Sequence, residues 1–202
     1  MDDFYFSIKT PSEGIYKEKG SKFLAFAYPI FSEDEFKTHL QELKKSHHDA
    51  RHHCYAFKLG LTENEYRYSD DGEPNNSAGK PIYGQILSKN ITNVGIVVVR
   101  YFGGTKLGVG GLVTAYKEAA ADALHNAEIV EQTVNIFYQI TFEYTAMSDV
   151  MNFIKLKQLN VTQQIFEENC LVEFSIRQTE AENIVINLSK IKDVSVKFLK
   201  TI

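Results

Sequence analysis

The residues that interrupt regular structure are confined to the first two thirds of this 202-residue chain. All twelve glycines, all four prolines and all six histidines precede residue 133. The residues that follow favour strands and helices with short polar turns, and no Pro/Gly/Ser-rich linker separates the two parts. We therefore expect two closely packed domains, residues 1–133 and 134–202, rather than domains on a flexible tether.

The second part shows strand and helix patterns in the order βαββαβ. Strands are expected at 134–144, 161–167, 170–177 and 194–199, and helices at 146–159 and 180–191. This order predicts a ferredoxin-like fold, a two-layer sandwich of one sheet and two helices. Because that fold serves many functions, it does not indicate which one this chain performs.

The first part predicts a less regular α/β domain. A hairpin is expected over 14–28, and a helix over 32–45 opens with a capping box of Ser32 and Glu35. The run 94–101 lacks polar alternation, which is typical of a strand buried on both faces. Further strands are expected at 52–59 and 66–68, and further helices at 81–88 and 112–126. The expected fold class is α+β, with a mixed sheet and helices preceding the ferredoxin-like domain.

Composition excludes several classes of protein. With 44% hydrophobic and 24% charged residues the chain is neither disordered nor collagenous. Its two cysteines lie far apart, which favours a reducing compartment over a disulfide framework. The N-terminus is acidic where a signal peptide would be basic, and the longest aliphatic run is far shorter than the ~20 residues of a membrane span. We expect a cytoplasmic protein without membrane partners.

The most informative stretch runs from Arg100 to Leu112, where a glycine-rich loop joins a buried strand to a helix. Free amide groups at such a junction bind anions, and Arg and Lys side chains add positive charge. The spacing matches neither a dinucleotide-binding fingerprint nor a P-loop. The alternative interpretation is a set of tight turns. The candidate ligand-binding residues here are Arg100, Gly103, Gly104, Lys106, Gly108, Gly110 and Gly111.

A second stretch, 69–81, carries three carboxylates within four residues: Asp70, Asp71 and Glu73. They would suit Mg²⁺ held together with a phosphate. Asp-Gly and Glu-Pro are also ordinary turn sequences, so the alternative is a polar loop that caps the helix at Pro81. The three carboxylates and Lys80 are kept as candidate ligand-binding residues, with no metal site and no cofactor assigned.

Four histidines and Cys54 cluster at 47–54, a composition that resembles a zinc site. On a strand, however, His52 and His53 point to opposite faces, which disfavours a shared metal. Arg51 and His52 are instead candidates for a polar ligand site. Neither Cys54 nor Ser77 has the surroundings of an activated nucleophile, so no catalytic residue is assigned and a non-enzymatic role is favoured.

The charge is unevenly distributed. The chain carries 22 Lys/Arg and 26 Asp/Glu, a net charge of −4. Residues 51–117 hold eight Lys/Arg against five Asp/Glu, a net charge of +3, which leaves −7 for the remainder. This pattern excludes a general polyanion coat but favours a focused phosphate-recognising surface, to which tyrosines of the same segment could add stacking.

Three segments together resemble the IMPACT family: 50–54, SDDGEPNNSAGKP at 69–81 and VVVRYFGGTKLGVGGLVTAY at 97–116. The resemblance implies an N-terminal domain similar to a ribosomal-protein domain and a C-terminal domain similar to the last domain of elongation factor G. Eukaryotic relatives act in translational control. The family's polar positions match as Arg51, His52, Asp70, Asp71, Glu73, Lys80, Arg100 and Lys106. Thr114 departs from the pattern, since a basic residue is common there.

The resemblance and the charge pattern favour a translation-associated regulator that binds RNA, the ribosome or another phosphate-bearing ligand through its glycine-rich loop. A translation-related protein is a further expected partner. Two alternatives stay open. One is an enzyme that acts on a small phosphorylated ligand with Mg²⁺, and the other is a protein-interaction module whose glycine-rich loop is structural.

Overall fold

The computed structural model describes residues 3–62 and 64–202, so Met1 and Asp2 of the acidic N-terminus lie outside it. The chain divides into two compact units. One comprises Tyr5–Gln132, and the other comprises Thr133–Ile202 together with Asp3 and Phe4. The expected α+β fold class is confirmed. Among the described residues, no helix is long and apolar enough to cross a membrane.

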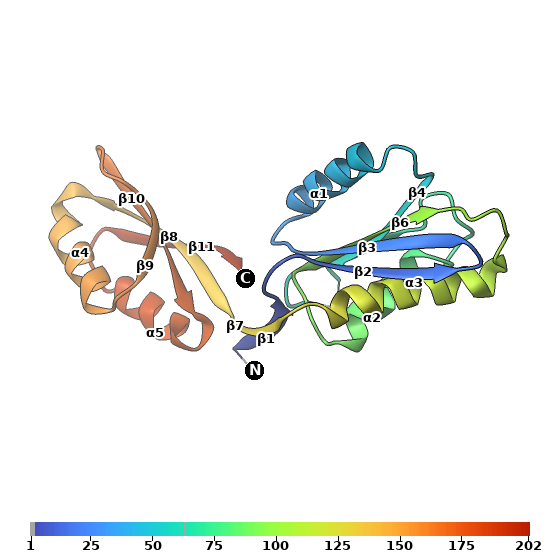
Figure 1. Ribbon diagram of the computed structural model, residues 1–202. Coiled ribbons are helices and arrows are strands. Elements are labelled where there is room, and N and C mark those ends of the chain that lie inside the picture. Colours follow the sequence, from blue (N-terminus) through green and yellow to red (C-terminus); the bar gives the residue numbers. More distant parts are fainter. Residues whose placement is uncertain (1–2, 63) are drawn as a thin grey trace. The chain divides into compact units, whose positions relative to one another are not determined.

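The N-terminal unit is built on a five-stranded sheet (Figure 1). Its strands, in spatial order, are β2 (Ser12–Glu18), β3 (Ser21–Pro29), β6 (Val94–Tyr101), β4 (His52–Lys58) and β5 (Tyr66–Ser69). Every neighbouring pair runs antiparallel. The expectation of a mixed sheet, with both parallel and antiparallel pairs, was therefore wrong. The hairpin β2–β3 turns through Lys19 and Gly20, which both adopt positive φ.

Strand β6 is the centre of this unit because it is buried on both faces, as its unbroken apolar run predicts. Val94, Ile96 and Val98 face a core made with α2 (Gly79–Ser88) and α3 (Gly108–His125). Val97 and Val99 face a second, smaller core made with α1 (Glu33–Ser46). Helices therefore cover both faces of the sheet (Figure 1).

The helix starts follow local sequence to different degrees. Ser32 caps α1 by accepting a hydrogen bond from the Glu35 backbone N–H, as predicted, although the Glu35 carboxylate bonds to Phe31 N rather than to the cap residue. Helix α3 begins at Gly108, four residues before the expected start. The glycines at 108, 110 and 111 thus form its first turn instead of a loop, although glycine has poor helix propensity and the buried core residues of α3 begin only at Leu112.

One strand pair was not expected from the sequence. Strand β1 (Phe4–Ile8) pairs with β7 (Ile129–Thr133), which lies more than 120 residues away along the chain. Neither strand is long or strongly alternating, so local pattern alone does not indicate that they meet.

The C-terminal unit has the expected βαββαβ order. Its elements are β8 (Asn135–Glu143), a 3₁₀ turn η1 (Tyr144–Ala146), α4 (Met147–Leu156), β9 (Asn160–Ile165), β10 (Asn169–Arg177), α5 (Gln178–Leu188) and β11 (Val194–Thr201). The antiparallel sheet runs β11-β8-β10-β9, and both helices pack on the same core. This is the ferredoxin-like arrangement.

Candidate functional site

The strand register brings the three motif segments to one end of the five-stranded sheet. His52 at the start of β4 lies opposite Arg100 near the end of β6. The acidic segment follows β5 and joins this end, because the Asp71 carboxylate accepts a hydrogen bond from His53 N at 2.7 Å. The glycine-rich segment follows β6 directly. Residues 50–53, 70–80 and 100–108 therefore share this region.

A buried ion pair connects these segments. The Arg100 guanidinium donates to Glu73 Oε1 at 2.5 Å, and the Tyr116 hydroxyl from α3 donates to the same oxygen at 2.8 Å. The side chains of Arg100 and Glu73 are only 9% and 4% exposed. The Arg100 guanidinium also lies 5.6 Å and 5.7 Å from the ring centroids of Phe23 and Phe102. Burial raises the pKa of Tyr116, so this hydroxyl stays a donor.

This ion pair changes the interpretation of Arg100 and Glu73. Sequence reasoning gave both residues contacts to a ligand, but the structure turns each toward the other inside the domain. Their role is to join β6, α3 and the acidic loop, because a buried charge needs a close partner. The Nε atom of Arg100 is buried without a hydrogen-bond partner, so the ion pair does not use the whole guanidinium.

The other two carboxylates also contact groups of the protein itself: Asp71 contacts His53 N on β4 and Lys44 on α1, whereas Asp70 binds its own loop. Asp70 Oδ1 accepts hydrogen bonds from the backbone N–H groups of Ala78 and Gly79, and Asp70 Oδ2 accepts one from Asn76 N. Asp70 thus caps the start of α2, as the alternative interpretation of this stretch expected. Asp71 and Gly72 form the tip of a tight turn with positive φ at both positions.

The described residues contain no group of three or more His, Cys, Asp or Glu side chains arranged to hold a metal ion. His52 Nδ1 lies 2.9 Å from the Asp71 carbonyl oxygen. Because a carbonyl only accepts hydrogen bonds, Nδ1 carries a proton in this contact. His53 lies on the opposite face and is buried, and burial lowers its pKa.

The glycines of the third segment differ in whether the structure requires glycine at their positions, and why. A side chain on Gly103 would overlap the backbone of Gly20, so glycine is required there by packing. Gly104 and Gly108 adopt positive φ. Gly110 has neither reason, because a Cβ there would meet nothing within 4 Å. Helix α3 has no side-chain cap and no acidic residue in its first turn, so its amide groups carry uncompensated positive character.

The cations at this end of the sheet differ from the carboxylates in their exposure. Arg51, Lys80 and Lys106 are exposed, and within the described chain they form no ion pair. Lys80 lies in the first turn of α2, and Lys106 lies just before α3. Phe102 is 58% exposed and follows β6 directly. The solvent-facing groups of this end therefore include three cations without an ion-pair partner among the described residues and one exposed aromatic ring.

The residues that the structure describes at this end include no activated nucleophile. Cys54 lies within the core, where its thiol donates a hydrogen bond to the Asp70 carbonyl at 3.0 Å. Burial raises the pKa of this thiol, so it stays protonated at neutral pH and is a poor nucleophile. The sequence had suggested no role for Tyr116 or Phe102, since their contacts to Glu73 and Arg100 arise only on folding.

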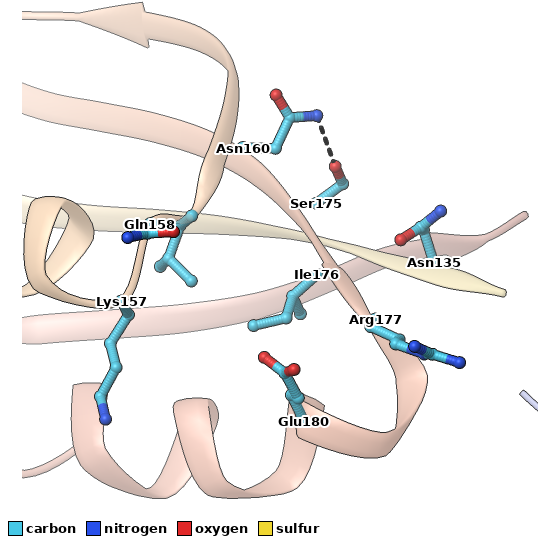
Figure 2. A pocket seen from close by; sticks show the side chains of 9 residues that line it. Asn135, Lys157, Gln158, Asn160, Ser175, Ile176, Arg177 and Glu180 are labelled. Carbon is cyan, nitrogen blue, oxygen red and sulfur yellow. Dashed lines mark hydrogen bonds between the residues drawn. The ribbon is translucent and has the colours of Figure 1, made fainter. Parts of the chain in front are cut away.

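A cavity of about 260 Å³ lies elsewhere, in the C-terminal unit between the end of α4, β10 and the start of α5 (Figure 2). Three of its nine lining residues carry amide side chains, and Asn160 donates to the Ser175 hydroxyl at 2.9 Å. Figure 2 shows that Lys157 and Arg177 lie on opposite sides of this cavity and that the lining side chains do not converge on one point. None of the residues predicted from sequence lines it.

Comparison with known proteins agrees with the motifs. Residues 19–124 match the model of the Impact N-terminal domain. The chain is 30% identical to the IMPACT family member YvyE of Bacillus subtilis over 88% of its length and 81% of that protein. It is 34% identical to the IMPACT family member YigZ of Escherichia coli over 65% of its length and 66% of that protein.

A crystal structure described as an hypothetical protein shares the fold, with a TM-score of 0.79, 24% identity and 99% coverage of both chains. The sequence match and the fold extend over both units, and the motif residues lie together in the first. The chain therefore belongs to the IMPACT family.

Proposed function

We propose that this chain is a non-enzymatic, translation-associated regulator that binds RNA at the end of its N-terminal sheet. The observation that carries the proposal is that the carboxylates at this end have partners within the protein, whereas the exposed cations have no ion-pair partner among the described residues. Asp70, Asp71 and Glu73 are engaged by donors of the protein itself, whereas Arg51, Lys80 and Lys106 face solvent. A surface of this kind attracts phosphate groups.

Two further features support phosphate as the recognised group. The first turn of α3 presents amide groups without a cap, and such amides bind anions. Gly110 leaves this turn bare where packing does not require it, so a ligand could approach the backbone closely. In this proposal Arg51, Lys80, Lys106, Gly104, Gly108 and Gly110 contact the phosphates. His52, at the start of β4 and opposite Arg100, is a further ligand contact in this proposal.

The remaining candidates form the frame of the site. Asp70, Asp71, Glu73, Arg100 and Gly103 hold the three segments in register by the contacts described above. Gly111 lies close to Leu107 inside the first turn of α3. An Mg²⁺-dependent enzyme would need the carboxylates turned toward its substrate, so their internal hydrogen bonds favour the binding function.

The experiment measures the salt dependence of RNA affinity. A fluorescently labelled single-stranded RNA is titrated with wild-type protein and with Lys80→Ala/Lys106→Ala between about 50 and 200 mM salt. A matched control, Lys58→Ala/Lys89→Ala, removes the same charge from the opposite end of β4 and α2. Because single strands release roughly 0.7 counterions per phosphate contact, losing two contacts lowers the slope of log K against log salt by about 1.4.

We expect the salt slope of Lys80→Ala/Lys106→Ala to fall by this amount and the salt slope of Lys58→Ala/Lys89→Ala to change less. Equal slopes for the two double variants would remove this end of the sheet as the binding site. Absence of any RNA binding by the wild-type protein at low salt would remove the function itself.

A further inference from the structure

The strongest feature that the proposed function has not used is a stack of three tyrosines on the edge strand β5 and helix α2. The Tyr66 and Tyr83 rings lie 4.5 Å apart between centroids, with planes only 16° from parallel. Tyr68 joins them at 6.3 Å from Tyr66 and 6.1 Å from Tyr83. The three rings thus form one aromatic cluster, which we call the tyrosine stack.

The tyrosine stack is not a core feature. Tyr66 is 45% exposed and Tyr68 is 37% exposed, although both carry large aromatic rings. Strand β5 is the last strand of its sheet, so beyond it no further strand of the sheet covers these residues. Tyr83 anchors the stack because it packs against the main core of the domain. The result is a rigid base with rings left open to solvent.

The helix beside the stack carries the same cation that the proposed RNA site uses. Lys80 and Gly84 lie four residues apart on α2 and therefore share one helix face. A Cβ on Gly84 would meet nothing within 4 Å, and its φ is not positive, so neither packing nor backbone conformation requires glycine there. Glycine in the middle of a helix is unfavourable. Its effect here is to leave one bare position on this face, between Lys80 and Leu87.

We propose that the tyrosine stack is a platform on which an unpaired base of RNA stacks while Lys80 holds the neighbouring phosphate. This inference rests on the proposed function and specifies its ligand as a single strand. Flat aromatic rings stack with any base, and an adjacent cation binds the backbone. Bases in a duplex are already stacked within the helix, so the platform selects single strands.

The composition of the surface favours a nucleic acid over a protein partner. Three nearly parallel tyrosines offer planar faces rimmed by hydroxyl groups, and the exposed neighbour on α2 is cationic. A groove for an amphipathic helix would instead be lined by aliphatic side chains in a hollow. Leu87, 49% exposed, is the aliphatic side chain one turn further along the helix face of Gly84.

The test compares Tyr66→Ala with Tyr66→Phe in binding a labelled single-stranded RNA. A stacked base contributes enough that alanine weakens binding about 5- to 150-fold, whereas phenylalanine keeps the ring and stays within about twofold. The salt slope is unchanged in both variants, because no phosphate contact is lost. Phe31→Ala removes another exposed aromatic ring, 57% exposed against 45% for Tyr66, from the same domain and serves as the control, with little expected change.

Different results would contradict the stacking platform and the phosphate site. Equal affinity of Tyr66→Ala and wild type, or equal affinity for a duplex and a single strand, would overturn the platform while leaving the phosphate site in place. A normal salt slope in Lys80→Ala/Lys106→Ala together with weak binding by Tyr66→Ala would overturn the phosphate site and the role of Lys80, and would keep only the stacking of a base on the tyrosines. Failure of the wild-type protein to bind RNA at low salt would overturn both.

Discussion

Breaking the ion pair between Glu73 and Arg100 should destabilise the N-terminal domain strongly. Glu73→Ala leaves the Arg100 guanidinium, 9% exposed, without the one charged partner that it has among the described residues. It also removes the acceptor of the Tyr116 hydroxyl. Removing one member of a buried ion pair costs about 3–5 kcal/mol. That is a large share of the ~5–15 kcal/mol by which a domain is stable.

The double variant Glu73→Leu/Arg100→Met distinguishes the cost of leaving one buried charge unpaired from the net contribution of the intact ion pair to stability. An apolar replacement of both charges is often neutral or stabilising, since it avoids the cost of desolvating them. We therefore expect the double variant to be more stable than Glu73→Ala, despite having two substitutions. Thermodynamic additivity should fail for these two sites, because their side chains are in contact.

The assay is urea unfolding of the full chain, followed by circular dichroism. With a slope of about 1.5 kcal/mol per molar urea, Glu73→Ala should lower the midpoint of the N-terminal transition by roughly 2–3 M. Glu131→Ala, which removes an exposed carboxylate, should leave the midpoint within about 0.3 M. If Glu73→Ala unfolds at the same urea midpoint as wild type, the ion pair does not hold β6, α3 and the acidic loop together.

Further predictions concern the glycines, the histidine and the cysteines of this domain. Gly103→Ala should cost about 1–3 kcal/mol of stability because its Cβ meets backbone atoms, whereas Gly110→Ala should stabilise α3 by up to about 1 kcal/mol and still weaken RNA binding. Urea unfolding and RNA titration check both. Burial lowers the pKa of His53 from 6.5, so the unfolded chain takes up a proton that the folded chain refuses. The free energy of unfolding should therefore fall as the pH decreases below 6.5, and less so in His53→Gln; parallel curves for the two proteins would contradict this. Cys54 and Cys170 are both buried, and a thiol reagent should modify them only in urea; rapid modification of the native chain would refute their burial.

The fold was largely predictable because its strongest signals are local. The apolar run of β6, the Ser32 cap of α1 and the alternation of the C-terminal strands each arise from neighbouring residues. The start of α3 was mispredicted because intrinsic propensity places glycine outside helices, whereas the helix extends one turn beyond its first core residue, Leu112, and includes the glycines. The β1–β7 pair depends on contacts distant in sequence and so escaped local reasoning.

The candidate site was predictable in position but not in role. Residue types and charge located the loops, and the register of β4 against β6 brings His52 and Arg100 together. Which side chains face the ligand depends on burial, and burial is decided by the whole domain. Glu73 and Arg100 therefore looked like ligand contacts in the sequence, while the structure makes them internal partners.

The most direct test of the central claim is to map where RNA contacts the protein. Backbone amide NMR spectra of ¹⁵N-labelled protein are recorded during titration with a short single-stranded RNA. The account predicts that the largest shifts fall on Gly104, Gly108, Gly110, Lys80 and Lys106, with small shifts in the C-terminal unit. Shifts concentrated in the C-terminal unit, or no change at those five amides when RNA binds, would contradict the claim that this end of the N-terminal sheet binds RNA.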